Sequence, residues 1–448
     1  MTKNEKKPDE QVLATSKTTT PGGTYTKAIV ERLTVHVFFD GTGNNRFNTA
    51  SDRENPNTSP KGSVSYKNYY SNIALLFMAM KEFDDVKKIY IQGSGTAKGE
   101  ADNTKGLGLA TGATGREVRI RNALTQLGDI TTKIDGSKVT LNVYGFSRGA
   151  AWARYFCHVI KTRNVKWKRS KINFVGIYDT VSSDSFTHYD DVNEMGLDIG
   201  QPQGINYIAH LTAQNEYREH FPLTSIHGAI KDKIGFECSL PGAHSDIGGG
   251  YSETADEKNR FLGFKEHKLN IGNLSPIRDE YIDYNWFFNK GYYLPKQITE
   301  KTKNYSDING RNIPKIAFYA NRTIKFHYQL VSCSIMYEIA KRKANFSLNK
   351  GTYFEKHLKE MKNISLLKKF HDSALNYVLA NYTKNTGGHK VPFLAEAEMK
   401  TIFNEYIHSS LTYNAIDNKG TILNKTKNAD GTLNYGRPTR PKVIKGFR

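Results

Sequence analysis

A serine flanked by glycines stands between two segments with different residue patterns. Ser147 is the centre of the sequence Gly145-Phe146-Ser147-Arg148-Gly149. Residues 139–144 alternate β-branched and apolar side chains, which predicts a strand, and residues 150–156 are rich in small apolar side chains, which predicts a helix. A sharp strand-to-helix turn exposes a serine hydroxyl, and glycine on either side avoids a clash. We interpret Ser147 as a nucleophile, against the alternative of an ordinary turn serine.

A serine hydroxyl is a weak nucleophile unless a base accepts its proton and an acid orients that base. In α/β hydrolases the acid and then the base follow the serine along the chain. Asp179 ends the apolar segment 174–178, and His244 follows the segment 235–240. Because each comes directly after a predicted strand, both should share a sheet edge with Ser147. The predicted catalytic triad is therefore Ser147, Asp179 and His244.

Other residues compete for these roles. Asp246 is the main rival for the acid, although shaping the loop that also carries His244 is the simpler interpretation. His327 is the rival base, with a partly buried helix histidine as the alternative. Asp179 could instead cap a helix or turn. Two further histidines rank lower: His210 and His188.

Acyl transfer also needs hydrogen-bond donors for the developing oxyanion, and loss of one such donor can cost about 3–4 kcal/mol. The backbone amide of Arg148, directly after the nucleophile, is one predicted donor. The loop at residues 39–45 should supply another, and its Gly41 and Thr42 are the candidates. Asp40 in this loop is a secondary candidate for the site. An ordinary Asp-Gly turn is the alternative.

Strand and helix patterns alternate from residue 33 to residue 240. Besides the strand before Ser147, the predicted strands are 33–39, 86–92, 171–178 and 234–240. The predicted helices are 69–80, 116–127 and most of 205–221. Strands that alternate with helices need crossover connections. The fold class is therefore α/β, with an α/β-hydrolase-like, mostly parallel sheet that has helices on both faces.

Changes in composition predict three regions. They are a flexible leader at 1–30, an α/β-hydrolase catalytic core at 31–255, and an insertion or lid with a mostly helical C-terminal region and basic tail at 256–448. Within the core, the polar segment 44–67 predicts a surface loop. The glycines of 104–115 lack the spacing of a nucleotide-binding loop, which favours a tight loop near the site. The aromatic segment 281–293 predicts mostly buried core, with any exposed rings available to a membrane.

The chain has 448 residues and a net charge of +20. Such a charge attracts polyanions, but the absence of nucleic-acid-binding motifs argues against nucleic acid and favours an anionic lipid surface or an acidic protein. No apolar run is long enough to span a bilayer, and the first ten residues lack the apolar core of a secretory signal. We predict no cofactor and no metal. The scattered cysteines fit a reducing cytoplasm and buried positions: Cys157, Cys238 and Cys333.

Several of these motifs together resemble a known family. They are residues 38–45, 145–150, 179–181 and 241–251. In this order they are similar to the type VI secretion system lipase effectors of family one, phospholipases of the α/β-hydrolase class that were formerly a domain of unknown function. Residues 213–222 resemble a further motif of that family, except that Asn215 stands where Asp is usual. The resemblance covers residues 33–255.

The resemblance implies a serine hydrolase that cleaves acyl esters of membrane phospholipids, with the triad assigned above. It implies an antibacterial toxin made in the bacterial cytoplasm without a signal peptide and secreted by a type VI system into the target-cell periplasm. The implied partners are a phospholipid membrane surface, an immunity protein and a component of the secretion apparatus. Two alternatives remain open: a serine esterase for a soluble ester or thioester, and a non-enzymatic membrane-binding or interaction module on a hydrolase scaffold.

Overall fold

The computed structural model describes most of the chain. The described residues are 14–20, 23–29, 31–56, 59–182, 196–200, 204–218, 221–264, 284–306, 312–410, 425–427 and 433–435. His188, the first part of the aromatic segment and most of the basic tail lie outside them.

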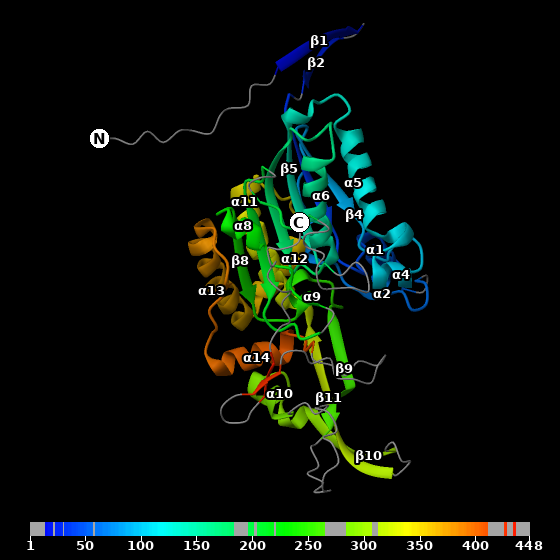
Figure 1. Ribbon diagram of the computed structural model, residues 1–448, viewed down its shortest axis with the longest axis vertical. Helices are drawn as coiled ribbons and strands as arrows, with labels where there is room; N and C mark the ends of the chain where they lie inside the picture. The colour runs from blue at the N-terminus through cyan, green and yellow to red at the C-terminus, as the bar shows by residue number, and fades with distance from the viewer. Residues whose placement is uncertain are drawn as a thin grey trace, which may run out of the picture.

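A seven-stranded sheet forms the centre of the described structure (Figure 1). Its strand order is β12-β8-β7-β6-β5-β3-β4, and neighbouring strands run parallel. The strands are β3 (Leu33–Phe39), β4 (Val86–Ile91), β5 (Val139–Phe146), β6 (Lys171–Tyr178), β7 (Ile208–Ala213), β8 (Gly235–Leu240) and β12 (His389–Lys390). The predicted α/β fold with a mostly parallel sheet is confirmed.

Helices cover both faces of this sheet. The alternation along β3 shows the two faces, because Val35 and Val37 belong to one hydrophobic cluster and Phe38 to the other. On the side of the valines the main helices are α5 (Arg116–Ile130), α6 (Arg148–Thr162) and α8 (His227–Lys231). On the side of Phe38 they are α3 (Asn72–Ala79), α11 (Gln329–Ala344), α12 (Tyr353–Asn363) and α13 (Ser365–Asn381). The predicted helical C-terminal region is therefore confirmed, and it forms one wall of the core.

A second, antiparallel sheet extends from the lower end of the molecule (Figure 1). It contains β9 (Thr254–Phe264), β10 (Ile298–Ser306) and β11 (Asn312–Lys325), with β11 in the middle. Two helices lie near it, α10 (Tyr284–Lys290) and α14 (Glu396–Tyr406). Trp286, Phe287, Tyr292 and Tyr293 are buried here, so these four rings of the aromatic segment are core residues, as predicted. The boundary predicted at residue 255 falls inside β9.

The helix predicted over most of 205–221 is wrong. Residues 208–213 instead form β7, which pairs with β6 on one side and β8 on the other. All six side chains of β7 are buried. Because both faces of this parallel strand are covered, its polar residues His210 and Thr212 are buried like its apolar ones, and no solvent-facing side marks the segment as a strand.

The surface loop predicted over 44–67 contains two helices, α1 (Arg46–Glu54) and α2 (Val64–Lys67). Asn45 begins α1, and its side chain accepts a hydrogen bond from the Phe47 amide at 3.1 Å. Polar side chains fill the contact between the two helices, where Asn48 Nδ2 donates to Ser65 Oγ at 3.0 Å. A polar composition concealed these helices because their buried face is itself hydrogen-bonded.

The remaining described elements are short. They are the hairpin β1 (Ala14–Thr20) and β2 (Gly23–Ile29) inside the predicted leader, α4 (Thr104–Leu109), η2 (Gly112–Thr114), η3 (Gly136–Lys138), α9 (His244–Gly248), η5 (Pro295–Gln297), η6 (Phe326–Tyr328), η7 (Tyr382–Lys384), β13 (Lys425–Lys427) and β14 (Leu433–Tyr435). Among the described residues, no helix has the length and apolar character that crossing a membrane requires.

Candidate active site

Ser147 occupies the sharp turn between β5 and α6. Its backbone has φ 59° and ψ −127°, a conformation that costs energy for any residue other than glycine. The two flanking glycines are required by close packing. A Cβ atom on Gly145 would lie 2.5 Å from the Gly149 carbonyl oxygen, and one on Gly149 would lie 2.3 Å from the Asp40 carbonyl oxygen. The turn is therefore pressed against the loop that follows β3.

Asp179 follows β6 and is fully buried next to this turn. The Ser147 amide donates to the Tyr178 carbonyl at 3.1 Å, and the Val181 amide donates to the Ser147 carbonyl at 3.3 Å. Asp179 Oδ1 accepts a hydrogen bond from the Ala213 amide at 2.7 Å, at the end of β7. The ends of three neighbouring strands, β5, β6 and β7, thus fix the position of Asp179.

His244 is the first residue of α9, and its imidazole contacts Asp179. The distance from Nδ1 to Asp179 Oδ2 is 2.6 Å. The His244 ring also lies 4.6 Å, between centroids, from the ring of Phe146, the residue before Ser147. An ionised Asp179 accepts the Nδ1 proton, which leaves Nε2 as a proton acceptor. The three predicted residues therefore lie together at the carboxyl edge of the sheet.

The burial of His244 favours the neutral form of its imidazole. Burial lowers the pKa of His244 below its usual range, although the hydrogen bond and charge of Asp179 oppose that shift. A neutral imidazole at neutral pH is the form that can accept a proton.

A buried ion pair between Glu216 and Arg218 supports the backbone of His244. The sequence pattern alone did not assign this pair a role. Glu216 Oε2 accepts a hydrogen bond from the His244 amide at 3.1 Å. Burial would raise the pKa of Glu216, but the charge and hydrogen bonds of Arg218 outweigh burial and lower it to about 2. Arg218 binds both carboxylate oxygens at 2.9 Å. Its guanidinium lies 3.5 Å from the centre of the Phe221 ring, which packs edge-on against His244.

Asn215, where the resembling family has Asp, has a structural role here. Its side-chain Oδ1 accepts a hydrogen bond from the backbone amide of Gly242 at 2.9 Å, and its backbone amide donates to the Gly242 carbonyl at 2.9 Å. Its Nδ2 donates to the Tyr217 hydroxyl at 2.9 Å. Asn215 therefore joins the segment after β7 to the loop that leads into His244.

The loop predicted to supply oxyanion donors lies against the serine turn. The Gly41 amide donates to Asp40 Oδ1 at 2.8 Å, so it reaches an oxyanion only if that bond breaks. Asp40 also accepts hydrogen bonds from the hydroxyls of Ser71 and Tyr90, and burial raises its pKa to about 6 in spite of them. Thr42 Oγ1 is buried and has no hydrogen-bond partner among the described residues.

The side chain of Arg148 ties the serine turn to the glycine-rich segment at 104–115. Its guanidinium donates to Ser94 Oγ at 3.2 Å, to the Gly106 carbonyl at 3.1 Å and to the Leu107 carbonyl. This segment lies beside the site, as predicted, but it forms α4 and η2 rather than a tight loop.

The residues that competed with Asp179 and His244 for the acid and base roles contact other groups. Asp246 pairs with His408, whose Nδ1 is 2.8 Å from Asp246 Oδ1. His210 Nε2 accepts from the Thr180 amide at 3.1 Å, and its Nδ1 contacts Glu237 at 2.9 Å. His327 lies on η6 against Phe326, and burial lowers its pKa.

Three cysteines are free and buried, as predicted: Cys157, Cys238 and Cys333. Within the described residues, no group of three or more His, Cys, Asp or Glu side chains is placed to hold a metal ion.

A family model matches part of the chain. Residues 160–270, which include Asp179 and His244, match the family model described as the type VI secretion system phospholipase effector Tle1-like, catalytic domain. The resemblance to the type VI lipase effectors is confirmed. No curated protein sequence matches the chain.

Two solved structures are similar. A structure of the Tle1 effector bound to the VgrG spike from the type 6 secretion system has a TM-score of 0.58 and 21% sequence identity, over 90% of this chain and 91% of that chain. The likeness shows a shared fold. A crystal structure of an uncharacterized protein from Pseudomonas aeruginosa has a TM-score of 0.37 and 21% identity, over 50% of this chain and 42% of that chain.

Proposed function

We propose that this protein is a serine-dependent phospholipase of the A type, with Ser147 as nucleophile, His244 as general base and Asp179 as the orienting acid. The observation that carries the proposal is the 2.6 Å contact between His244 Nδ1 and Asp179 Oδ2, beside a serine held at φ 59°. An imidazole oriented by a carboxylate is the kind of base that a serine needs in order to become reactive. The match of residues 160–270 to a phospholipase catalytic domain supports the substrate class.

In the first half of the reaction, His244 Nε2 accepts the hydroxyl proton of Ser147 while Oγ attacks the acyl carbonyl carbon. The carbonyl oxygen becomes an oxyanion, for which we propose the backbone amides of Arg148 and Thr42 as donors, with Gly41 as the further candidate. The tetrahedral intermediate then collapses. The proton on His244 passes to the departing lysophospholipid alcohol, and the acyl group remains as an ester of Ser147.

In the second half, His244 takes a proton from a water molecule, and the resulting hydroxide attacks the acyl-serine ester. The proton returns to Ser147 Oγ, and a fatty acid leaves. Glu216 accepts the His244 amide and thereby keeps the imidazole in register with Ser147 during both halves.

The cellular setting is proposed from the comparisons. The similar Tle1 effector is bound to a VgrG spike, which supports a spike component as the secretion partner of this chain. We further propose delivery by a type VI system to the periplasm of a target cell, peripheral contact with its phospholipid membrane, and an immunity protein that protects the producer.

The test is release of fatty acid and lysophospholipid from phospholipid vesicles by the wild-type chain and by Ser147→Ala, with short-chain soluble esters assayed in parallel. We expect release by the wild type and none by the variant. Hydrolysis of soluble esters alone would favour the soluble-ester alternative. Membrane damage that is equal for both proteins, without product release, would favour a non-enzymatic module.

A fluorogenic phosphonate probe that labels reactive serines gives a second measurement. Mapping of the labelled peptide should identify Ser147, whereas labelling at any other residue would contradict the assignment.

A further inference from the structure

The segment that follows α14 lies against the loop of the catalytic histidine. We call residues 407–410 the C-terminal strap. Within it, the His408 amide donates to Asp246 Oδ2 at 3.0 Å, and His408 Nδ1 donates to Asp246 Oδ1 at 2.8 Å. Ser410 Oγ donates to the Asn215 carbonyl at 3.0 Å and accepts from the Tyr217 amide at 2.8 Å. The strap therefore contacts both segments that support His244.

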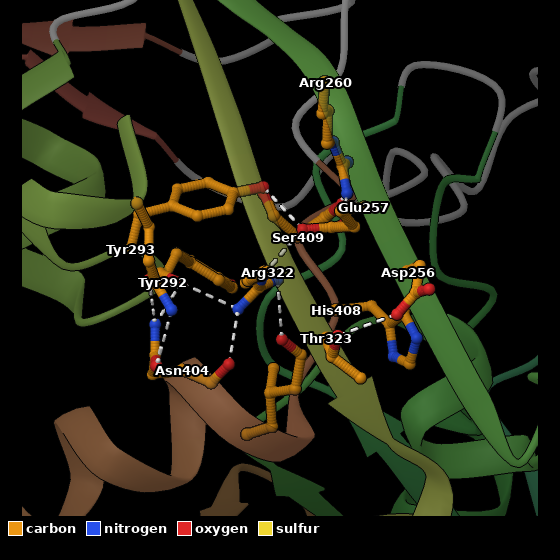
Figure 2. Close-up of polar contacts among 12 residues, drawn as sticks. Asp256, Glu257, Arg260, Tyr292, Tyr293, Arg322, Thr323, Asn404, His408 and Ser409 are labelled. Atoms are coloured by element: carbon orange, nitrogen blue, oxygen red, sulfur yellow. Dashed lines mark hydrogen bonds and ion pairs between the residues drawn. The ribbon is translucent and has the colours of Figure 1, made fainter. Parts of the chain in front are cut away.

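A buried arginine anchors the strap (Figure 2). Arg322, on β11, donates to the carbonyl oxygen of Ile407 at 3.1 Å and to Glu257 Oε2 at 2.6 Å. Its side chain is fully buried. The same guanidinium donates to three further carbonyls, those of Tyr292, Phe403 and Asn404. Because a buried cation that loses its partners is strongly destabilising, these contacts fix the strap against the second sheet.

The strap acts on α9 through a single carboxylate. Besides its bonds to His408, Asp246 Oδ2 accepts the Ala243 amide at 2.8 Å. Ala243 directly precedes His244, so Asp246 couples the start of α9 to the strap. The two ring nitrogens of His408 differ. Nδ1 is hydrogen-bonded to Asp246, whereas Nε2 is buried without a hydrogen-bond partner among the described residues. The ring stacks on Tyr251 at 3.6 Å between centroids.

We propose that His408 is a positioning residue for His244: through Nδ1 and Asp246 it holds α9 so that the imidazole of His244 faces Ser147. It does not touch the substrate or carry the transferred proton. This inference rests on the proposed catalytic roles of Ser147 and His244, and it assigns part of the C-terminal region a task in catalysis.

The difference between the two ring nitrogens of His408 gives a sharp test. An asparagine side chain places a donor where Nδ1 lies, a glutamine places one where the unpaired Nε2 lies, and an alanine removes both. With a phosphonate probe, we expect His408→Ala and His408→Gln to slow labelling of Ser147 by about 10- to 100-fold, and His408→Asn to stay within about threefold of the wild type. The pH dependence of labelling should be the same for His408→Asn as for the wild type.

His371 offers a matched control, because it is also buried and its Nδ1 contacts a carboxylate, Asp372, at 2.8 Å. His371→Ala should lower the melting temperature without slowing labelling of the folded protein. Labelling of Ser147 in His408→Ala at the wild-type rate would overturn the proposal. So would equal losses in His408→Asn and His408→Ala together with a shifted pH profile, which would make His408 a proton carrier.

Vesicle hydrolysis separates this inference from the proposed function. If the wild type labels at Ser147 but releases no fatty acid, the phospholipase assignment fails while the His408 comparison still decides the positioning role. If the wild type does not label at all, both proposals fall.

Discussion

At the scale of the residue, the backbone of Ser147 is strained. A φ of 59° is unfavourable for any residue with a side chain. The proposed role of the hydroxyl as a nucleophile explains why a serine, rather than a glycine, occupies this position. We predict that Ser147→Gly and Ser147→Ala both abolish hydrolysis, but that Ser147→Gly unfolds with a free energy about 1 kcal/mol higher than Ser147→Ala, because glycine relieves the strain.

Urea unfolding of the two variants measures this difference. Equal stabilities, or a more stable alanine variant, would mean that the turn is not strained in solution.

The pH dependence of the reaction follows from His244. The proposed general base must be neutral in order to accept a proton, so we expect activity to fall as the pH drops through its pKa. Burial lowers that pKa below the usual value of 6.5, with Asp179 opposing. We therefore predict that the acid limb of kcat/KM lies below pH 6.5 and that activity is retained on the alkaline side of it.

Rates on a soluble ester across the acid range would show this limb without interference from changes in vesicle charge. An acid limb well above pH 6.5 would show either that His244 is more exposed than the structure has it or that another group limits the reaction.

At the scale of the element, the serine turn works because β5, α6 and the loop after β3 approach one another closely at Gly149. A Cβ atom there would meet backbone oxygens of Phe39 and Asp40, which cannot rotate away. We predict that Gly149→Ala lowers the free energy of unfolding by about 1–3 kcal/mol and slows hydrolysis by displacing the oxyanion loop.

Gly128 in α5 is the matched control. A Cβ atom added to it meets Trp167 only at 3.7 Å, an ordinary contact. Gly128→Ala should therefore raise stability by about 0.5–1 kcal/mol without affecting hydrolysis. Similar losses of stability in the two variants would contradict the close approach at Gly149.

The elements also show what the sequence could and could not provide. Strands β3 and β6 have the predicted bounds, since their β-branched and apolar runs are bordered by polar segments. Strand β7 was missed because it is short and its polar residues, His210 and Thr212, are buried along with the apolar ones. The sequence could place the proposed site residues Ser147, Asp179 and His244 at one sheet edge because each lies just past the end of a predicted strand.

The residues that support His244 were beyond such reasoning. His408 contacts Asp246 across 162 positions of the chain, and no local pattern encodes that distance. Glu216 lies within the 213–222 motif, but its burial against the His244 amide depends on how β7 and α9 pack. A pattern identifies residues at strand ends more readily than residues that hold them in place.

At the scale of the whole molecule, the described C-terminal helices and the seven-stranded sheet are one packed structure. Helices α11–α13 cover one face of the sheet, β12 extends it beyond β8, and the strap reaches the catalytic loop. A region that resembles nothing by motif is thus joined to the site by packing and hydrogen bonds.

The net charge of +20 is the property of the whole chain that bears most directly on a membrane substrate. Each Lys or Arg near an anionic surface contributes about 1 kcal/mol, and salt screens that attraction within a Debye length of about 10 Å at 0.1 M. Binding of the inactive Ser147→Ala protein to vesicles isolates this effect from hydrolysis. We predict strong cosedimentation with vesicles rich in anionic lipid at low salt, progressive release as salt is added, and weak binding to purely zwitterionic vesicles at every salt concentration. Binding that is independent of both lipid charge and salt would show that apolar contacts, rather than the net positive charge, bring the protein to lipid, and would leave the assignment of Ser147 untouched.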